Sequence, residues 1–121
     1  MVIFSNLGKK GNFGNQLFQI ASTIGIATKN NHKFAFPKWE YAPCFAHSFP
    51  LYDEQEVYQL LKENNYHYNE IKLKAGDFDL NGWFQSEKYF NKELVKSYLK
   101  FKPELINKVK EKYSKVFLKK N

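Results

Sequence analysis

The hydrophobic pattern at the start of the chain predicts a strand, a helix and a second strand. Residues 2–4 form a short apolar run, typical of a buried parallel strand. From Asn15 onward, apolar residues recur at spacings of three and four and so share one helix face: Leu17, Ile20, Ala21, Ile24 and Ala27. Asn30 is a typical helix end, and residues 33–36 form a second strand before Pro37. This unit predicts an α/β fold with a parallel sheet.

The middle of the chain has a weaker pattern. Residues 38–53 show no clear period but many aromatic residues and prolines, which predicts an ordered loop. We expect a short helix over residues 54–63, a strand over 66–73 and another strand over 78–84. Gly82 inside that last strand indicates that backbone or ligand approaches closely there. Gly25 lies inside the first predicted helix. It weakens that helix slightly and allows another segment to pack closely against it.

The last third of the sequence predicts two helices. Ser86 can cap the first of them, and its apolar face would hold Phe90, Leu94, Tyr98 and Phe101. Pro103 suits the first turn of the second helix, whose apolar stripe would hold Leu105, Val109, Tyr113 and Phe117. In an alternating α/β chain the next element is a strand, so the pattern reads as one half of a larger fold.

Composition narrows the class of protein. The chain of 121 residues carries a formal charge of +7, and all 19 of its basic residues are lysine. Genome composition explains such lysine richness as well as function does, and the absence of arginine disfavours phosphate and guanine readout. We therefore expect no nucleic-acid partner, no membrane span and a cytoplasmic location. Cys44 is the single cysteine, which excludes an internal disulfide. The histidines at 32, 47 and 67 lack metal-ligand spacing.

A glycine-rich loop is the strongest candidate for chemistry. Residues 11–19 read GNFGNQLFQ and follow the first predicted strand. A strand end, a glycine turn and a helix N-terminus together form an anion-binding corner. Gly11 and Gly14 permit close ligand approach, while Asn15 and Gln16 add amide donors and acceptors. The spacing matches neither GxGxxG nor GxxxxGK[ST]. The alternative is purely structural: a tight turn, Asn15 as the helix cap, and the two phenylalanines at 13 and 18 in the core.

Three carboxylates are weaker candidates. Asp77 and Asp79 are two residues apart and would share one face of a strand. There a carboxylate can act as the general base for an acceptor hydroxyl. The alternative is turn chemistry around Gly76. Glu87 lies at a predicted helix start, where a carboxylate either favours the helix dipole or serves the acceptor side of a site.

Two sequence blocks carry a family resemblance. GNFGNQLFQIAS at residues 11–22 resembles the GxxGNQxFQxA motif near the start of the family 11 glycosyltransferases, the α-1,2-fucosyltransferases. LNGWFQSEKYF at residues 80–90 resembles that family's GYFQSEKYF segment, and FKPEL at 101–105 fits the stretch that follows. The resemblance covers essentially the whole chain but only the N-terminal half of the family's length.

The resemblance implies a function, a fold and a set of site residues. Such enzymes transfer fucose from GDP-fucose to a galactose hydroxyl of a glycan, with inversion and without a metal or further cofactor. They have a GT-B-like architecture of two α/β lobes, and residues 1–121 would be the Rossmann-like, acceptor-side lobe. The implied binding residues are Gly11, Asn12, Phe13, Gly14, Asn15, Gln16, Trp83 and Gln85. Amides and aromatic faces suit sugars. Asn12 stands where related loops carry an arginine.

One family feature is absent from this sequence. The family's second half begins with His-x-Arg-Arg-Gly-Asp, whose arginine holds the donor pyrophosphate, and this chain contains no arginine. Removing such a charge stabiliser costs a factor of about 10²–10³ in rate. We therefore expect a truncated chain that lacks the donor lobe and is inactive alone. The alternatives are a non-catalytic module that binds a glycan or a second polypeptide, and a basic nucleic-acid-binding domain.

Overall fold

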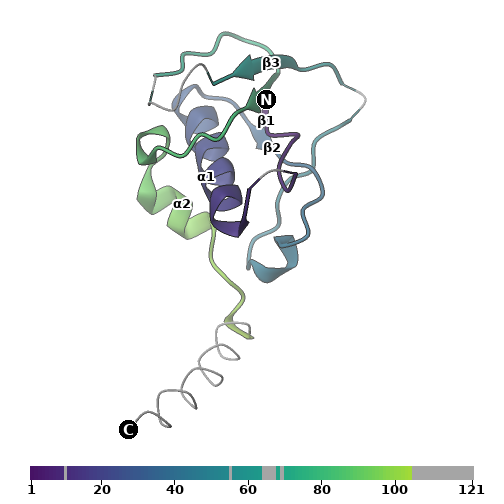
Figure 1. Ribbon diagram of the computed structural model, residues 1–121, viewed down its shortest axis with the longest axis vertical. Coiled ribbons are helices and arrows are strands. Elements are labelled where there is room, and N and C mark those ends of the chain that lie inside the picture. Colours follow the sequence, from purple (N-terminus) through teal and green to yellow (C-terminus); the bar gives the residue numbers. More distant parts are fainter. Residues whose placement is uncertain (10, 55, 64–67, 69, 105–121) are drawn as a thin grey trace, which may run out of the picture.

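Four parallel strands form the centre of the protein. The computed structural model describes residues 1–9, 11–54, 56–63, 68 and 70–104. In the order β2-β1-β4-β3, the strands are Phe34–Ala35, Val2–Ile3, Phe78–Asn81 and Gln59–Lys62 (Figure 1). Every pairing within the sheet is parallel. The predicted α/β fold with a parallel sheet is confirmed.

Helix α1, Phe13–Lys29, lies between the sheet and a second layer (Figure 1). Its residues 19–27 are buried without interruption, so it is covered on more than its predicted apolar face. Ile20 and Ile24 pack in one core cluster with Val2 of β1 and Leu80 of β4. The short 3₁₀ helix η2, Glu87–Tyr89, and helix α2, Lys92–Tyr98, contact α1 as well. Burial on several sides explains why the α1 sequence is apolar or small almost all round.

Gly25 is the point where η2 meets α1 most closely. A Cβ atom at this position would lie 2.1 Å from the carbonyl oxygen of Tyr89 and 2.5 Å from the Cα atom of Phe90. Both neighbours are backbone atoms. The predicted close packing at Gly25 is confirmed.

The segment after β2 is irregular but ordered, as predicted for residues 38–53. It contains the 3₁₀ turn η1, Ala42–Cys44. It then returns along the outer edge of β2, where Phe36 donates from its N–H group to Pro50 O (2.8 Å) and accepts from Tyr52 N (3.1 Å). These bonds cover an edge that would otherwise expose unpaired backbone groups.

Two predicted elements in the middle of the chain are wrong. Within the expected helix of residues 54–63, the structure has strand β3 instead. Val57 and Leu60 are 90% and 50% exposed, and only Leu61 reaches the core. In the expected strand of 66–73, the described residues 68 and 70–73 belong to no strand. Residues 66, 67 and 69 lie outside the described part.

Later elements are shorter than predicted. The expected strand of residues 78–84 ends at Asn81, because Gly82 turns the chain with a φ of 149°. Ser86 caps only η2, and α2 begins one turn later with Asn91 as its N-cap. The expected face is confirmed in part: Phe90 and Tyr98 are partly buried against the core, whereas Leu94 and Phe101 are exposed and Val95 is the buried residue of α2. The expected last helix, with its stripe from Leu105 to Phe117, lies outside the described residues.

Candidate functional site

The central strand pair places the two sequence blocks together. β1 and β4 are parallel neighbours, with Ile3 paired to Asp79. Because the carboxyl ends of parallel strands meet at one edge of a sheet, the loops that follow them lie side by side. After β1 comes the glycine-rich loop, and after β4 comes the segment 82–86. Neighbouring carboxyl ends in an open α/β sheet are a usual position for ligands.

Gly11 is the tightest position of the loop. Its φ is 80°, in the left-handed region that favours glycine. A Cβ atom there would also lie 2.7 Å from Asn15 Cβ and 2.9 Å from Trp83 Cζ3. Conformation and space therefore both require glycine. The contact joins the loop, the start of α1 and the segment after β4 at one point.

Asn12, not Asn15, caps α1. The Asn12 Oδ1 atom accepts from Asn15 N at 3.0 Å, and Asn15 Oδ1 accepts from Asn12 N at 3.2 Å. This reciprocal pair is a capping box, so the helix begins at Phe13 rather than at Asn15. Within the described part of the chain, no group accepts from the N–H groups of Phe13 and Gly14. These two donors, at the positive end of the helix dipole, can face an anionic or carbonyl oxygen.

A pair of amide side chains connects the two blocks directly. Asn15 Nδ2 donates to Gln85 Oε1 at 3.1 Å, and Gln85 Nε2 donates back to the Asn15 carbonyl at 3.3 Å. Gln85 Nε2 also contacts the carbonyl oxygen of Trp83. The two amides therefore fix the orientation of each other and of the Trp83 backbone. Both side chains are partly buried, so their role here is to hold the site together.

Gln16 is committed to the framework on both ends of its amide. It is 5% exposed. Its Nε2 donates to the Gly11 carbonyl at 3.1 Å, and its Oε1 accepts from Trp39 Nε1 at 2.7 Å. Phe13 packs on the same indole, with ring centroids 6.1 Å apart and planes at 7°. The side chains of Gln16 and Phe13 therefore hold the loop in place, and the Gln16 amide is bonded inside the protein at both its nitrogen and its oxygen.

The segment after β4 has an unusual backbone that two further residues stabilise. Phe84 is buried and adopts a φ of 48°, which is rare for a residue with a side chain. Ser22 Oγ donates to its carbonyl at 2.7 Å, and Glu63 Oε1 accepts from the N–H groups of Trp83 and Phe84 at 3.3 Å each. The sequence analysis did not identify Ser22 or Glu63. No local motif marks them, because their partners are distant in sequence.

The carboxylates predicted for chemistry each have a different partner. Asp79 accepts from Ser5 N (3.0 Å) and Ser5 Oγ (2.5 Å), just after β1. Since its neighbour Leu80 packs on the α1 side, Asp79 points to the opposite face of the sheet. Asp77 precedes β4 at the other edge, where it pairs with the chain's amino group at 3.4 Å.

Glu87, the third candidate carboxylate, lies on the protein surface. Glu87 forms an exposed pair with Lys92 at 3.0 Å, in the first turn of η2. Such a surface pair contributes about 0–1 kcal/mol. Near Asp79, burial raises the pKa of Tyr52, and the negative charges of Glu54 and Asp79 raise it further.

The surface that remains open to a ligand is small and mostly uncharged. Gly11, Asn12 and Gly14 are exposed, and Trp83 is 37% exposed beside them. This arrangement offers an indole, two helix N–H donors and room for close approach. Among the residues that the structure describes, no group of three His, Cys, Asp or Glu side chains could hold a metal. No helix in the same part of the chain is long and apolar enough to cross a membrane.

Comparison with models of known protein families, with curated proteins and with solved structures gave no match.

Proposed function

We propose that this chain forms the Rossmann-like, acceptor-side lobe of a GT-B-like glycosyltransferase. The reaction is fucosyl transfer from GDP-fucose to a galactose hydroxyl of a glycan. One observation carries the proposal: the blocks GNFGNQLFQ and GWFQSEKYF, which bear the family resemblance, meet in space. Asn15 and Gln85, 70 residues apart, exchange hydrogen bonds at the carboxyl edge between β1 and β4.

The chemistry of the open surface supports a sugar ligand. The C–H face of a pyranose ring packs on an aromatic side chain, and Trp83 presents such a side chain. The N–H groups of Phe13 and Gly14 can donate to a sugar or phosphate oxygen at the helix N-terminus. Gly14 is exposed and leaves room for the ligand to approach the backbone, whereas the space beside Gly11 is filled by Asn15 and Trp83. A galactoside or the fucosyl group of the donor fits this combination of donors and apolar surface.

The proposed reaction needs a cationic clamp that this chain lacks. Departure of GDP develops negative charge on the pyrophosphate, which a cationic clamp must stabilise. The 121 residues contain no arginine, and lysine cannot provide the bidentate geometry. We therefore assign sugar positioning to this lobe and the donor clamp to a second lobe or a second polypeptide. The alternative function is a non-catalytic module that binds glycans or pairs with another chain.

Two tryptophan indole signals allow a direct binding test. The chain contains only Trp39 and Trp83, so an ¹⁵N-labelled sample gives two indole N–H resonances, assigned with a Trp83→Phe variant. We expect methyl β-galactoside to shift the Trp83 resonance and the amides of residues 11–16, with a dissociation constant on the order of millimolar. Methyl β-glucoside, which differs at one hydroxyl, is the matched control and should bind several-fold more weakly.

A transfer assay completes the test. Purified chain is incubated with GDP-fucose and lactose, and product is measured by mass spectrometry. We expect no transfer by the chain alone. Fucosylated lactose from the chain alone would contradict the need for a second lobe. If neither sugar nor GDP-fucose shifts any signal in residues 11–16 and 82–86, the sugar-binding role is wrong. Galactoside binding without any effect of GDP-fucose would favour the non-catalytic module.

A further inference from the structure

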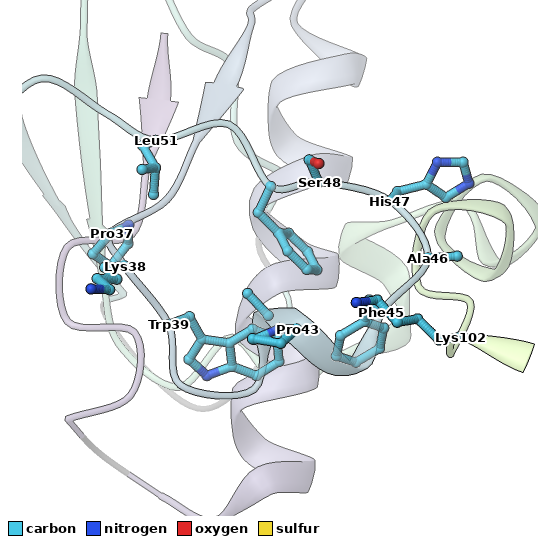
Figure 2. Close-up of a pocket in the computed structure, with 12 residues that line it drawn as sticks. Pro37, Lys38, Trp39, Pro43, Phe45, Ala46, His47, Ser48, Leu51 and Lys102 are labelled. Atoms are coloured by element: carbon cyan, nitrogen blue, oxygen red, sulfur yellow. The ribbon is translucent and has the colours of Figure 1, made fainter. Parts of the chain in front are cut away.

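A second location, a pocket of about 480 Å³, is formed mainly by the irregular segment that follows β2, and none of its lining residues belongs to the glycine-rich loop. Figure 2 shows residues 37–51 running around its opening, with Pro37 and Lys38 on one side and Phe45 and Lys102 on the other. The volume is in the range of small-molecule sites. No part of the sequence analysis or of the proposed function uses this pocket.

The floor of the pocket is a rigid aromatic cluster. Trp39 and Phe45 are 4% and 2% exposed, and their rings stack at 5.6 Å with planes at 21°. Phe49 meets both rings edge-on, with centroids 5.6 Å away in each case. Pro37 and Pro43 add further apolar surface at the opening. The rings of Trp39 and Phe45 are covered, so the apolar surface that a ligand can reach is that of half-buried Pro37 and Phe49 and of exposed Pro43.

Two exposed lysines lie on opposite sides of the opening (Figure 2). Lys102 N donates to Cys44 O at 2.9 Å, and Phe101 stacks on Phe45 at 4.8 Å, so the backbone at Lys102 is fixed against the pocket. Lys38 lies two residues after Phe36, whose backbone is bonded to the returning segment. The backbone near each lysine is therefore held, and each ammonium group can turn toward the opening.

Charge complementarity identifies the kind of ligand. None of the residues that line the pocket is acidic, and within the described residues no ion pair neutralises Lys38 or Lys102. His47 also lines the pocket, but its ring stacks on Tyr98 and points away from the opening in Figure 2. An anionic group at the opening gains from two positive charges without a competing carboxylate. A cation of the same shape would be repelled.

We infer that this pocket binds a small organic anion with a flat apolar body, of the class of the aromatic carboxylates. The apolar body lies against Pro37, Pro43 and Phe49, above the buried rings of Trp39 and Phe45, and the carboxylate is attracted by Lys38 and Lys102 on the two sides of the opening. The site does not depend on the proposed glycosyltransferase function. It is nevertheless linked to it physically, since the Trp39 indole that forms its floor donates to Gln16 below the glycine-rich loop.

The test compares three probes with the same protein. Indole-3-acetate has both the apolar body and the charge, tryptamine has the same body with the opposite charge, and acetate has the charge alone. We expect indole-3-acetate to shift the Trp39 indole signal and the amides of residues 42–48 saturably, with a dissociation constant of about 1 mM. Tryptamine should bind at least about tenfold more weakly, and acetate should give no shift at the same concentration.

Variants separate the pocket from general surface charge. Lys38→Met and Lys102→Met should each weaken indole-3-acetate binding about fivefold, and added salt should weaken it further. Lys96→Met, on exposed α2, is the matched control and should leave it unchanged. Three results would overturn the inference. They are binding of tryptamine as tight as that of indole-3-acetate, full affinity in a variant that combines Lys38→Met with Lys102→Met, and no shift in residues 42–48. The Trp83 signal reports the glycine-rich loop separately, so failure here and failure of the proposed function are distinguishable.

Discussion

Substituting Gly25 in the middle of α1 gives a sharp test of how the layers pack. Replacing a helical glycine by alanine ordinarily stabilises a protein by up to about 1 kcal/mol, because alanine has the higher helix propensity. In this structure we expect the opposite sign. The added Cβ would lie 2.1 Å from Tyr89 O and 2.5 Å from Phe90 Cα, far inside the 3.4–4 Å of ordinary contact.

The magnitude follows from which atoms must move. Both obstructing atoms belong to the backbone of η2 and the residue after it, so no side-chain rotation relieves the overlap. Overpacking of this kind costs about 1–3 kcal/mol, and backbone obstruction places Gly25→Ala at the upper end. Subtracting about 1 kcal/mol of helix propensity leaves a net loss of about 2 kcal/mol. For a chain of this length that corresponds to a fall in melting temperature of roughly 8 °C.

The assay is urea unfolding followed by far-ultraviolet circular dichroism, with linear extrapolation to water. Gly14→Ala is the matched control, because the same substitution in the same helix meets only Asn12 Oδ1, at 3.4 Å. Gly14→Ala should be neutral or stabilise by up to about 1 kcal/mol. A Gly25→Ala protein as stable as the wild type would refute the close approach of η2 to α1.

Three further predictions concern single contacts. Asn12→Ala should lower the free energy of unfolding by about 1 kcal/mol through loss of the helix cap, whereas Asn12→Asp keeps the acceptor and should retain stability in the same urea assay. Trp39→Phe removes the buried donor to Gln16 and should cost about 1–3 kcal/mol, measured likewise; an unchanged midpoint would contradict the bond. Burial raises the pKa of Tyr98, so its contribution to stability is fully present below the unfolded pKa of about 10 and is lost as pH rises through the folded pKa. Tyr98→Phe should therefore reduce the loss of stability above pH ~10, and an unchanged slope would refute the assignment.

The sequence predicted the parts of the fold that depend on local pattern. β1, α1 and β2 follow from strong apolar runs and from a glycine turn between them. β3 was missed because an edge strand of four residues shows little of its own period. Leu60 is half exposed, and pairing with β4 decides its conformation. The apolar spacing of Val57, Leu60 and Leu61 imitates a helix face although only Leu61 reaches the core.

The candidate site was predictable as a set of residues but not as a set of roles. Asn15 was expected at the cap, yet Asn12 is the N-cap and the helix begins at Phe13, because Asn12 and Asn15 bond each other in a capping box. Gln16 reads as a ligand amide in sequence, but both ends of its amide are bonded inside the protein. Glu63, which holds the backbone after β4, has no sequence motif at all. Roles of this kind depend on contacts between distant segments, which periodicity does not encode.

The role of Asn12 bears on how charge is distributed in the proposed reaction. Its carboxamide oxygen accepts from Asn15 N, so the side chain is directed back onto the helix rather than out to a ligand. An arginine at this position, as in the fucosyltransferase loops that this one resembles, cannot accept that bond, and its guanidinium would be free to reach an anion. Asparagine at position 12 therefore provides a helix cap, whereas arginine would provide a positive charge instead. Because this chain has the cap, the start of α1 attracts negative charge through the helix dipole and two N–H groups. That is about half an elementary charge, less than a departing nucleoside diphosphate requires. The proposed reaction therefore needs its cation from the donor side, and this lobe supplies shape and hydrogen bonds.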